Sequence, residues 1–180
     1  DFLHLYRTYG VDLQLCGADQ FGNSSTGVHL IKRLENGSAD VWSTPLIIDP
    51  VTGRKFGKSE GNAVWLASSD NGSGNFTSIF DFYQFWLNQA DESVEYLIKI
   101  YSVLDKETID KILEEHRAHP EHRLAQKALA KSVTEIVHGK NSAAAAILLT
   151  DLLFGDRRIE TLSESDIESI ALLLPTIRLS

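Results

Sequence analysis

The sequence is poor in several residue types, and each shortage limits what the protein can be. It contains one cysteine, Cys16, no methionine and four prolines among 180 residues. A lone cysteine excludes an internal disulfide and fits a reducing compartment. No apolar run is long enough to cross a membrane, so we expect no membrane partner. The net charge of -8 argues against coating of nucleic acid over the whole surface, but it allows a local basic patch.

The absence of methionine also bears on how the chain begins. Asp1 opens the sequence within an amphipathic pattern, and no initiator methionine precedes it. We therefore expect the C-terminal part of something longer, with any targeting peptide upstream. The 180 residues suffice for one large domain or two small ones.

Two parts of different character follow one another along the chain. Apolar spacing in the first part predicts a helix ending near Gly10, then a strand over 11–16, a helix over 24–34 and a short strand over 44–50. This alternation indicates a parallel sheet, or half of one. We therefore predict an α/β part over residues 1–75, followed by an all-α bundle over 76–180.

The second part shows helical periodicity throughout. The predicted helices cover 79–87, 91–104, 105–117, 121–138, 142–153 and 164–174. The expected N-caps are Asp91, Asp105, Ser142 and either Ser163 or Ser165, and the expected stops are Gly139 and Gly155. The aromatic residues Phe82, Phe85 and Trp86 are expected to lie in the core of the bundle.

The most unusual stretch is the loop over 53–62, in which Lys55 and Lys58 flank a Phe-Gly pair. Its glycines expose backbone N–H donors, and its lysines supply the charge that holds a polyphosphate. It misses the Walker A pattern, because Gly53 and Gly57 enclose three residues instead of four. On this stretch alone, a phosphate-binding loop and a solvated hairpin turn fit equally well.

Gly17, Asp19 and Gln20 follow the first predicted strand, at the edge where open α/β sheets place ligands. A carboxylate there can accept two hydrogen bonds from a ribose diol, and an amide can bond a carbonyl or carboxylate without adding charge. A turn with an Asx hydrogen bond is the commoner explanation of such residues. Lys55 and Lys58 could stabilise charge on a departing pyrophosphate, although surface lysines explain them equally simply.

Three histidines raise the question of a metal site. His116, His119 and His122 are spaced three apart, but Pro120 interrupts them in a charged context. A closed zinc site needs a fourth ligand and a supporting shell, so we predict no metal. Cys16 lies in an apolar stretch and is expected in the core, not as a nucleophile.

A basic stripe is predicted in the helical part. Arg123, Lys127 and Lys131 recur every four residues, which puts them on one face of a helix. Such a stripe can contact a phosphate backbone, although a solvated face is the commoner cause of the pattern.

Five blocks of sequence carry a resemblance to a known family. They are LQLCGADQFGN (13–23), PLI (45–47), KFGKSEGNAVWL (55–66), FYQFW (82–86) and VHG (137–139). In order and spacing they resemble the bacterial and mitochondrial type of tyrosyl-tRNA synthetase, a class I aminoacyl-tRNA synthetase. The resemblance implies the second half of a Rossmann-like catalytic domain, followed by the helical domain that lies near the anticodon arm of tRNA. It also implies activation of L-tyrosine by ATP with Mg²⁺, transfer to tRNA(Tyr), and a homodimer.

The resemblance assigns roles to residues of the blocks 13–23 and 55–66 and to Asp1. The lysine loop corresponds to the K-M-S-K-S signature, in which Lys55 and Lys58 would stabilise pyrophosphate and Ser59 would support the loop. Gly17 and Asp19 would bind the ribose of the adenylate. The tyrosine ligands would be Asp1 for the phenol hydroxyl, Gln14 for the pocket floor and Gln20 for the carboxyl or carbonyl group.

The sequence departs from the family pattern in several places. Phe21 stands where tryptophan is usual, and Cys16 and Ala18 replace commoner small residues. The loop over 68–75 is longer than in bacterial members, which together with Asn62 favours the mitochondrial matrix over a bacterial cytoplasm. The H-I-G-H-type signature and the S4-like domain are missing, so we expect this segment alone to be inactive.

Two other hypotheses remain at the level of sequence. The helical part could bind RNA as a cofactor for splicing of group I introns, for which the basic stripe is the only local support. The chain could also be a scaffold that is derived from an enzyme and has no catalytic activity. The presence of the polar residues that catalysis would use argues against this hypothesis; they are Lys55, Lys58, Asp19 and Gln20.

Overall fold

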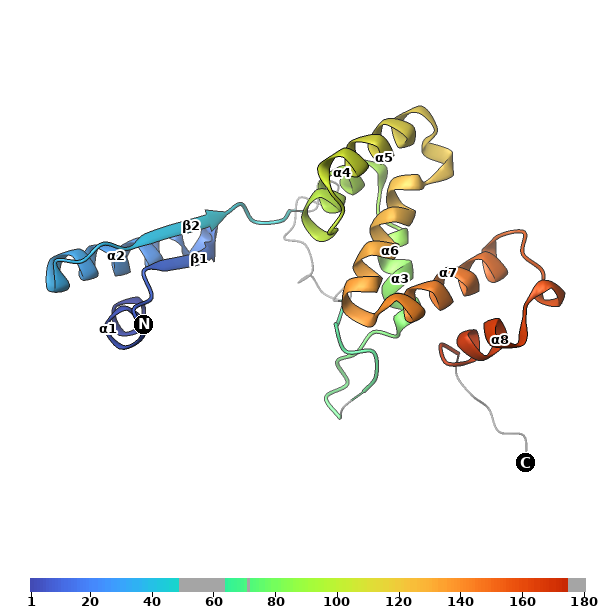
Figure 1. The fold of residues 1–180 in the computed structure, drawn as a ribbon, viewed down its shortest axis with the longest axis horizontal. Helices are drawn as coiled ribbons and strands as arrows, with labels where there is room; N and C mark the ends of the chain where they lie inside the picture. Colours follow the sequence, from blue (N-terminus) through green and yellow to red (C-terminus); the bar gives the residue numbers. More distant parts are fainter. Residues whose placement is uncertain (49–63, 71, 175–180) are drawn as a thin grey trace. The chain divides into compact units, whose positions relative to one another are not determined.

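The computed structural model describes residues 1–48, 64–70 and 72–174. The described residues form two compact units, one within 1–48 and one over the remainder (Figure 1). Residues 64–70 and 72–75 belong with the second unit, and the domain boundary at residue 75 stays a prediction.

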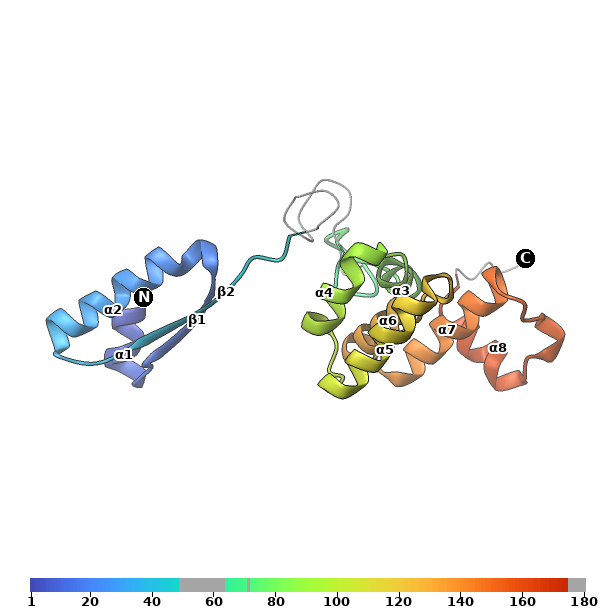
Figure 2. The ribbon, with the colours of Figure 1, turned by 90° about the horizontal axis from the view of Figure 1, so that it is seen from above.

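The first unit alternates helices and strands. Its elements are α1 (Phe2–Tyr9), β1 (Leu13–Gly17), the 3-10 turn η1 (Ala18–Gln20), α2 (Phe21–Glu35) and β2 (Asp40–Thr44). The strands β1 and β2 pair in parallel, with a register running from Leu13↔Asp40 to Gly17↔Thr44, and α2 is the crossover between them (Figure 2). The predicted parallel sheet is therefore confirmed.

The ends of these elements agree with the sequence only in part. Gly10 ends α1 in the left-handed conformation, with φ 68°, as predicted. The second strand is Asp40–Thr44, in which exposed and half-buried residues alternate, so of the predicted strand over 44–50 only Thr44 belongs to it among the described residues. It ends before Pro45, whose missing N–H cannot join the ladder. The helix α2 starts earlier than predicted, because η1 leads directly into it at Phe21.

The core of the first unit lies between the sheet and its two helices. Phe2, Ile31 and Ala39 are buried there, and partly buried apolar side chains pack against them: Leu3, Tyr6, Val11, Val28 and Val41. On the other face of the sheet, Leu13, Leu15 and Trp42 are 47%, 68% and 65% exposed. Parallel sheets are normally covered on both faces, and this face has the apolar composition that such a cover requires.

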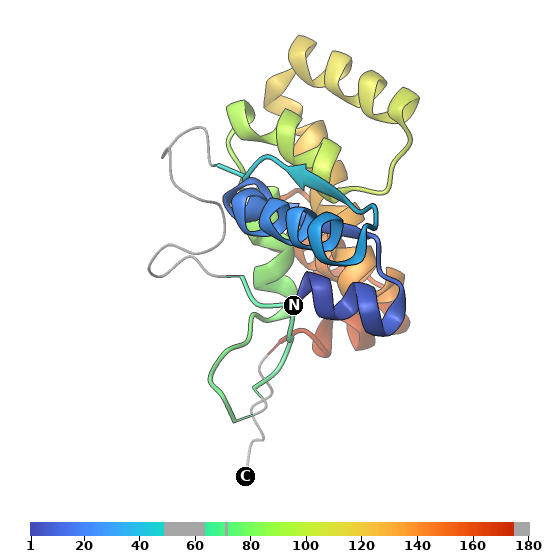
Figure 3. The same ribbon diagram turned by 90° about the vertical axis from the view of Figure 1, so that its left-hand side faces the viewer.

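The second unit is helical from Ile79 onward, and its described residues before that position form no helix or strand. It contains α3 (Ile79–Leu87), α4 (Asp91–Tyr101), α5 (Lys106–Ala118), α6 (Leu124–His138), α7 (Lys140–Phe154) and α8 (Glu164–Ala171), with 3-10 turns η2 (Pro120–His122) and η3 (Ile159–Thr161). Figures 2 and 3 show these helices from two further sides. Within the described part of the chain, no helix is long and apolar enough to span a membrane.

The helix α6 is the centre of this unit and packs against α3, α4, α5 and α7. Its inward side is small and apolar, with Ala125, Leu129 and Ala130 fully buried. From α3, Phe82 and Trp86 are buried against it, which confirms the aromatic helix as core, while Phe85 is half-buried. The ring of Phe82 meets the ring of His138 edge-on, with centroids 4.7 Å apart.

The caps of these helices test the predictions directly. Asp105 and Ser163 accept hydrogen bonds from the backbone N–H groups of their first turns and are confirmed as N-caps. Gly139 and Gly155 are confirmed as stops. The prediction of Asp91 as an N-cap is wrong, because α4 begins with Asp91 and Ala90 is the cap. The prediction of Ser142 as an N-cap is also wrong. Gly139, with φ 87°, turns the chain directly from α6 into α7, so α7 begins before Ser142.

Candidate functional site

The candidate site is the C-terminal edge of β1, where the strand turns into α2. Gly17 is the last residue of β1, Asp19 and Gln20 lie in η1, and α2 begins at Phe21. The structure thus brings three predicted site residues together within a single turn. Polar groups at this edge are well placed for a ligand, because the strand end and the helix N-terminus converge there.

Gly17 permits the Asp19 carboxylate to lie against the backbone. A Cβ built on Gly17 would be 2.9 Å from Oδ1 of Asp19 and 3.4 Å from Cδ2 of Leu46. The backbone of Gly17 is extended, with φ -73° and ψ 157°, so any residue could adopt it. The effect of glycine is therefore steric: the missing side chain leaves room for the carboxylate, which a side chain at position 17 would displace. Asp19 itself is exposed to solvent.

Gln20 occupies the N-cap position of α2, but its side chain does not cap the helix backbone. Its Oε1 accepts a hydrogen bond from Nδ2 of Asn23, at 3.0 Å. The sequence reasoning missed Asn23. Its spacing, three residues after the N-cap, is the signal that could have found it, because these two positions exchange hydrogen bonds at many helix starts.

The two other expected tyrosine ligands lie on α1 and β1. Asp1 is exposed at the N-cap of α1, where its backbone oxygen accepts the N–H of Leu5 at 2.9 Å. Gln14 is half-buried on β1 and pairs in register with Val41 of β2. Its Oε1 is buried and has no hydrogen-bond partner in the structure. A buried carbonyl oxygen of this kind can still accept a bond from a ligand or water.

The lysine loop carries three of the predicted site residues. They are Lys55, Lys58 and Ser59, and they lie outside the described residues. Their assignment therefore stays a prediction, and it depends on the resemblance of the sequence.

The predicted basic stripe is interrupted. The helix α6 begins at Leu124, and Arg123 precedes it as a cap residue with φ 53°. The Arg123 guanidinium donates to the backbone oxygen of Leu87 at 2.6 Å, so it ties α6 to the end of α3. Lys127 and Lys131 are exposed on α6, and Lys131 lies 4.0 Å from Glu135. The placement of all three on one helix was wrong, because the chain turns left-handed at Arg123.

The three histidines do not share one environment. His116 is buried, with Nε2 3.4 Å from the Asp91 carboxylate. The exposed rings of His119 and His122 stack at 5.2 Å, on either side of Glu121 in the chain. No group of three or more metal-ligating side chains occurs in the residues that the structure describes.

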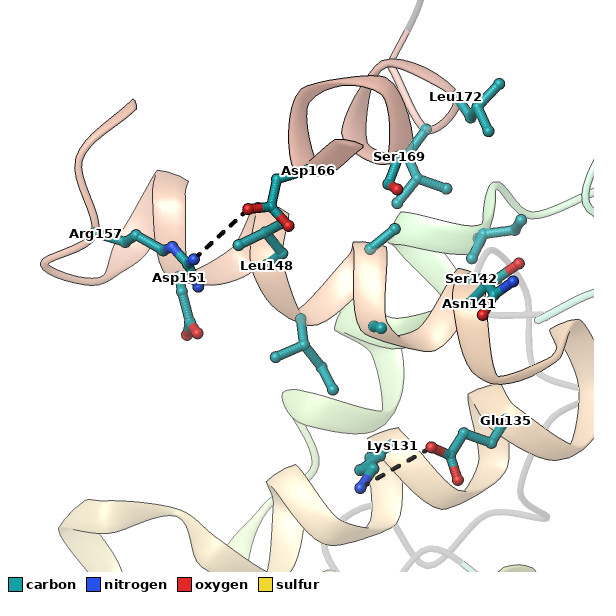
Figure 4. Close-up of a pocket in the computed structure, with 15 residues that line it drawn as sticks. Lys131, Glu135, Asn141, Ser142, Leu148, Asp151, Arg157, Asp166, Ser169 and Leu172 are labelled. Atoms are coloured by element: carbon teal, nitrogen blue, oxygen red, sulfur yellow. Dashed lines mark ion pairs between the residues drawn. The ribbon is translucent and has the colours of Figure 1, made fainter. Parts of the chain in front are cut away.

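A pocket of about 760 Å³ opens between α3, α6, α7 and α8 (Figure 4). Its charged lining residues are Lys131, Arg157, Glu135, Asp151 and Asp166. Both basic groups are near carboxylates, since Lys131 lies 4.0 Å from Glu135 and Arg157 lies 4.0 Å from Asp166. The lining therefore has an excess of negative charge, which disfavours binding of a phosphate group inside the pocket.

The fold agrees with comparison to known proteins. Residues 1–155 match the model of the family described as tRNA synthetases class I (W and Y), and the chain belongs to this family. More particularly, it is similar to proteins named Tyrosine–tRNA ligase. That of Flavobacterium johnsoniae is 44% identical over 168 residues, which are 92% of this chain and 37% of the relative. That of Cytophaga hutchinsonii is 41% identical over 183 residues, covering 100% of this chain and 41% of the relative.

Solved structures point in the same direction. A C-terminally truncated mitochondrial tyrosyl-tRNA synthetase of Aspergillus nidulans superposes with a TM-score of 0.66 and 30% identity, covering 86% of this chain and 42% of that one. The corresponding protein of Coccidioides posadasii gives a TM-score of 0.64 and 29% identity, covering 81% of this chain and 40% of that one. The resemblance read from the sequence is confirmed. The chain spans only about two fifths of the length of these relatives.

Proposed function

We propose that this chain is part of a tyrosine–tRNA ligase, which activates L-tyrosine with ATP and Mg²⁺ and transfers it to tRNA(Tyr). The observation that carries the proposal is the turn of Gly17, Asp19 and Gln20 at the end of β1, within the matched residues 1–155. The similar proteins bear the name of this activity.

The chemistry of the turn suits an aminoacyl adenylate. The Asp19 carboxylate can accept both hydroxyl groups of a ribose, and Gly17 leaves it the room to do so. Gln20 would bond the carboxyl or carbonyl oxygen of tyrosine, and Gln14 would offer its unpaired Oε1 on the pocket floor. Asp1 would accept the phenol hydrogen bond. Phenylalanine would leave that carboxylate unpaired and so be rejected.

The lysine loop would act in the activation step. The tyrosine carboxylate attacks the α-phosphorus of ATP, the bond to the β-phosphate oxygen breaks, and negative charge moves onto the departing pyrophosphate. The ammonium groups of Lys55 and Lys58 would stabilise that charge more in the transition state than in the bound substrate, while Ser59 would support the loop. Mg²⁺ would enter bound to ATP.

The remaining assignments concern partners and location. Lys127 and Lys131, exposed on α6, and Arg123 just before it are proposed contacts for tRNA. We further propose a homodimer in the mitochondrial matrix, since the solved neighbours are mitochondrial, while the bacterial relatives make a bacterial cytoplasm the alternative. No feature of the described residues favours intron splicing over ligation.

Tyrosine-dependent exchange of pyrophosphate into ATP tests the proposal, with protein expressed from its complete coding sequence. Replacing Lys55 and Lys58 together by alanine should lower the exchange rate by about 100-fold or more, with little change in tyrosine affinity. Lys106→Ala with Lys111→Ala, on α5, removes the same charge and should leave the rate unchanged. A wild-type protein without tyrosine-dependent exchange would exclude the function.

A further inference from the structure

We propose that Asn23 is a positioning residue, which fixes the end of the Gln20 amide that faces the ligand. The inference rests on the proposed function, in which Gln20 contacts the carboxyl or carbonyl oxygen of tyrosine. It adds a residue to that site and specifies the polarity of the contact.

The starting point is the hydrogen bond between the two amides. Nδ2 of Asn23 donates to Oε1 of Gln20 at 3.0 Å. Gln20 is the N-cap of α2, and Asn23 is the third residue of that helix. The N-cap side chain makes no bond to the helix backbone, so the pair has replaced the usual cap by a bond between side chains.

With Nδ2 of Asn23 as the donor, this bond sets which atoms Gln20 can offer to a ligand. A glutamine amide carries an acceptor oxygen at one end and two N–H donors at the other, and a half-turn about its last bond exchanges them. With Oε1 engaged by Asn23, the Nε2 donors are the end left for a ligand. A carboxylate or carbonyl oxygen accepts from them, whereas the reversed amide would set oxygen against oxygen.

A donor fixed before the ligand arrives costs no reorganisation on binding. It is also uncharged, so it can orient a carboxylate without neutralising it. The Asn23 bond should therefore matter for ligands that carry the carboxyl group, and it should not matter for the ring end of the substrate.

Two variants at this position separate polarity from shape. Asn23→Leu keeps the branched shape of the side chain and removes the donor, so the amide of Gln20 can rotate freely. Asn23→Asp keeps the shape but can only accept, so it draws the Nε2 donors toward itself and turns Oε1 to the ligand. An acidic residue in the first turn of a helix is favourable for stability. The aspartate variant should consequently melt no lower than wild type while it binds tyrosine worse.

The experiment compares KM for tyrosine with the inhibition constant of tyramine, which lacks the carboxyl group, in pyrophosphate exchange by the complete protein. Asn23→Leu should raise KM for tyrosine about fivefold, and Asn23→Asp at least tenfold, with tyramine changed by less than twofold. Thr26→Ala is the matched control. Thr26 is exposed and lies three residues further along α2, where its hydroxyl group donates to the Gly22 carbonyl at 3.0 Å.

The outcomes distinguish the inference from the function on which it rests. Equal weakening of tyrosine and tyramine would show a general distortion of the pocket, and an unchanged KM would show that Asn23 does not orient Gln20. Either result overturns the inference while exchange persists. Absence of tyrosine-dependent exchange in the wild-type protein overturns the proposed function, and the inference with it.

Discussion

Gly27 of α2 lies directly against Phe2 of α1. A Cβ built on Gly27 would be 2.8 Å from Cβ of Phe2 and 2.9 Å from its Cδ1, closer than carbon atoms approach one another. The two helices therefore meet only because position 27 has no side chain. Phe2 is buried and follows Asp1 in the chain, so this contact also fixes the start of α1, where the proposed ligand of the phenol hydroxyl lies.

Replacing Gly27 by alanine should therefore destabilise the first unit. The added methyl group overlaps Phe2, and overpacking of this kind costs about 1–3 kcal/mol in the free energy of unfolding. Gly22 is the matched control, because it lies in the same helix and a Cβ there would meet no atom within 4 Å. Gly22→Ala should be neutral or stabilising by up to about 1 kcal/mol, since alanine favours a helix.

Urea denaturation of the two variants measures this difference. A lower unfolding free energy for Gly27→Ala and an equal or higher one for Gly22→Ala would establish that the close approach to Phe2 causes the loss of stability. If both substitutions changed the unfolding free energy alike, the contact between α1 and α2 would not depend on Gly27.

Gly17→Ala should weaken the binding of ATP more than it lowers the stability of the protein. The extended backbone of Gly17 accepts alanine without strain, but the new methyl group would be 2.9 Å from Oδ1 of Asp19. The carboxylate must then swing away from its place beside the strand end. We expect KM for ATP to rise about tenfold, which corresponds to about 1.4 kcal/mol, with an unchanged melting temperature. Pyrophosphate exchange at varied ATP measures the effect, and an unaltered KM would remove Asp19 from ribose binding.

The sequence predicts which helices and strands this fold contains better than it predicts the residues at which they begin and end. Local chemistry determines the end of α1 at Gly10 and the caps Asp105 and Ser163, and these were predicted correctly. The second strand was placed too late because its apolar run continues past Pro45. Pairing with β1, which no local pattern shows, is what selects Asp40–Thr44.

In the candidate site, too, local sequence predicts some features, while others depend on the three-dimensional structure. The turn of Gly17, Asp19 and Gln20 was found because residues at a strand end have a recognisable type and order. The bond from Asn23 was missed because it depends on side-chain geometry at the helix start. Arg123 was misplaced for a related reason: helical spacing cannot reveal that its backbone turns left-handed, with φ 53°, before α6 begins.

Glu95 should make the helical unit sensitive to acid. Hydrogen bonds from Arg117 and Lys99, at 2.6 and 2.9 Å, lower the pKa of its carboxyl group from 4.5 to about 2. Because the pKa is lower in the folded state, the stabilisation is complete above about pH 4.5 and is lost as the pH falls toward 2. Salt should weaken the effect, since the three side chains are largely open to solvent.

Melting temperatures measured between these pH values test the role of Glu95. Glu95→Gln should flatten the decline of stability with acid and lower the stability at neutral pH. Glu114→Gln, an exposed change of the same charge on α5, serves as the control and should keep the wild-type slope. An unchanged slope in Glu95→Gln would contradict the assignment.

Gln126 connects α6 to the start of α4 at a fully buried position. Its Nε2 donates to the Asp91 carboxylate at 2.6 Å and, more weakly, to the Gln89 backbone oxygen at 3.4 Å. Its Oε1 is buried and has no hydrogen-bond partner in the structure. The cost of burying this oxygen therefore offsets part of the stability that the two hydrogen bonds of Nε2 contribute.

Gln126→Met should therefore cost little. Methionine fills the same space and removes the unpaired oxygen, and the exposed Asp91 carboxylate can turn to water when its bond is lost. We expect a loss of about 1 kcal/mol or less in the free energy of unfolding. Gln126→Ala creates a cavity against α3 and α4 and should cost about 2–4 kcal/mol. Denaturant unfolding gives both values. If methionine proved as costly as alanine, the amide would be worth more through its hydrogen bonds than its buried oxygen costs.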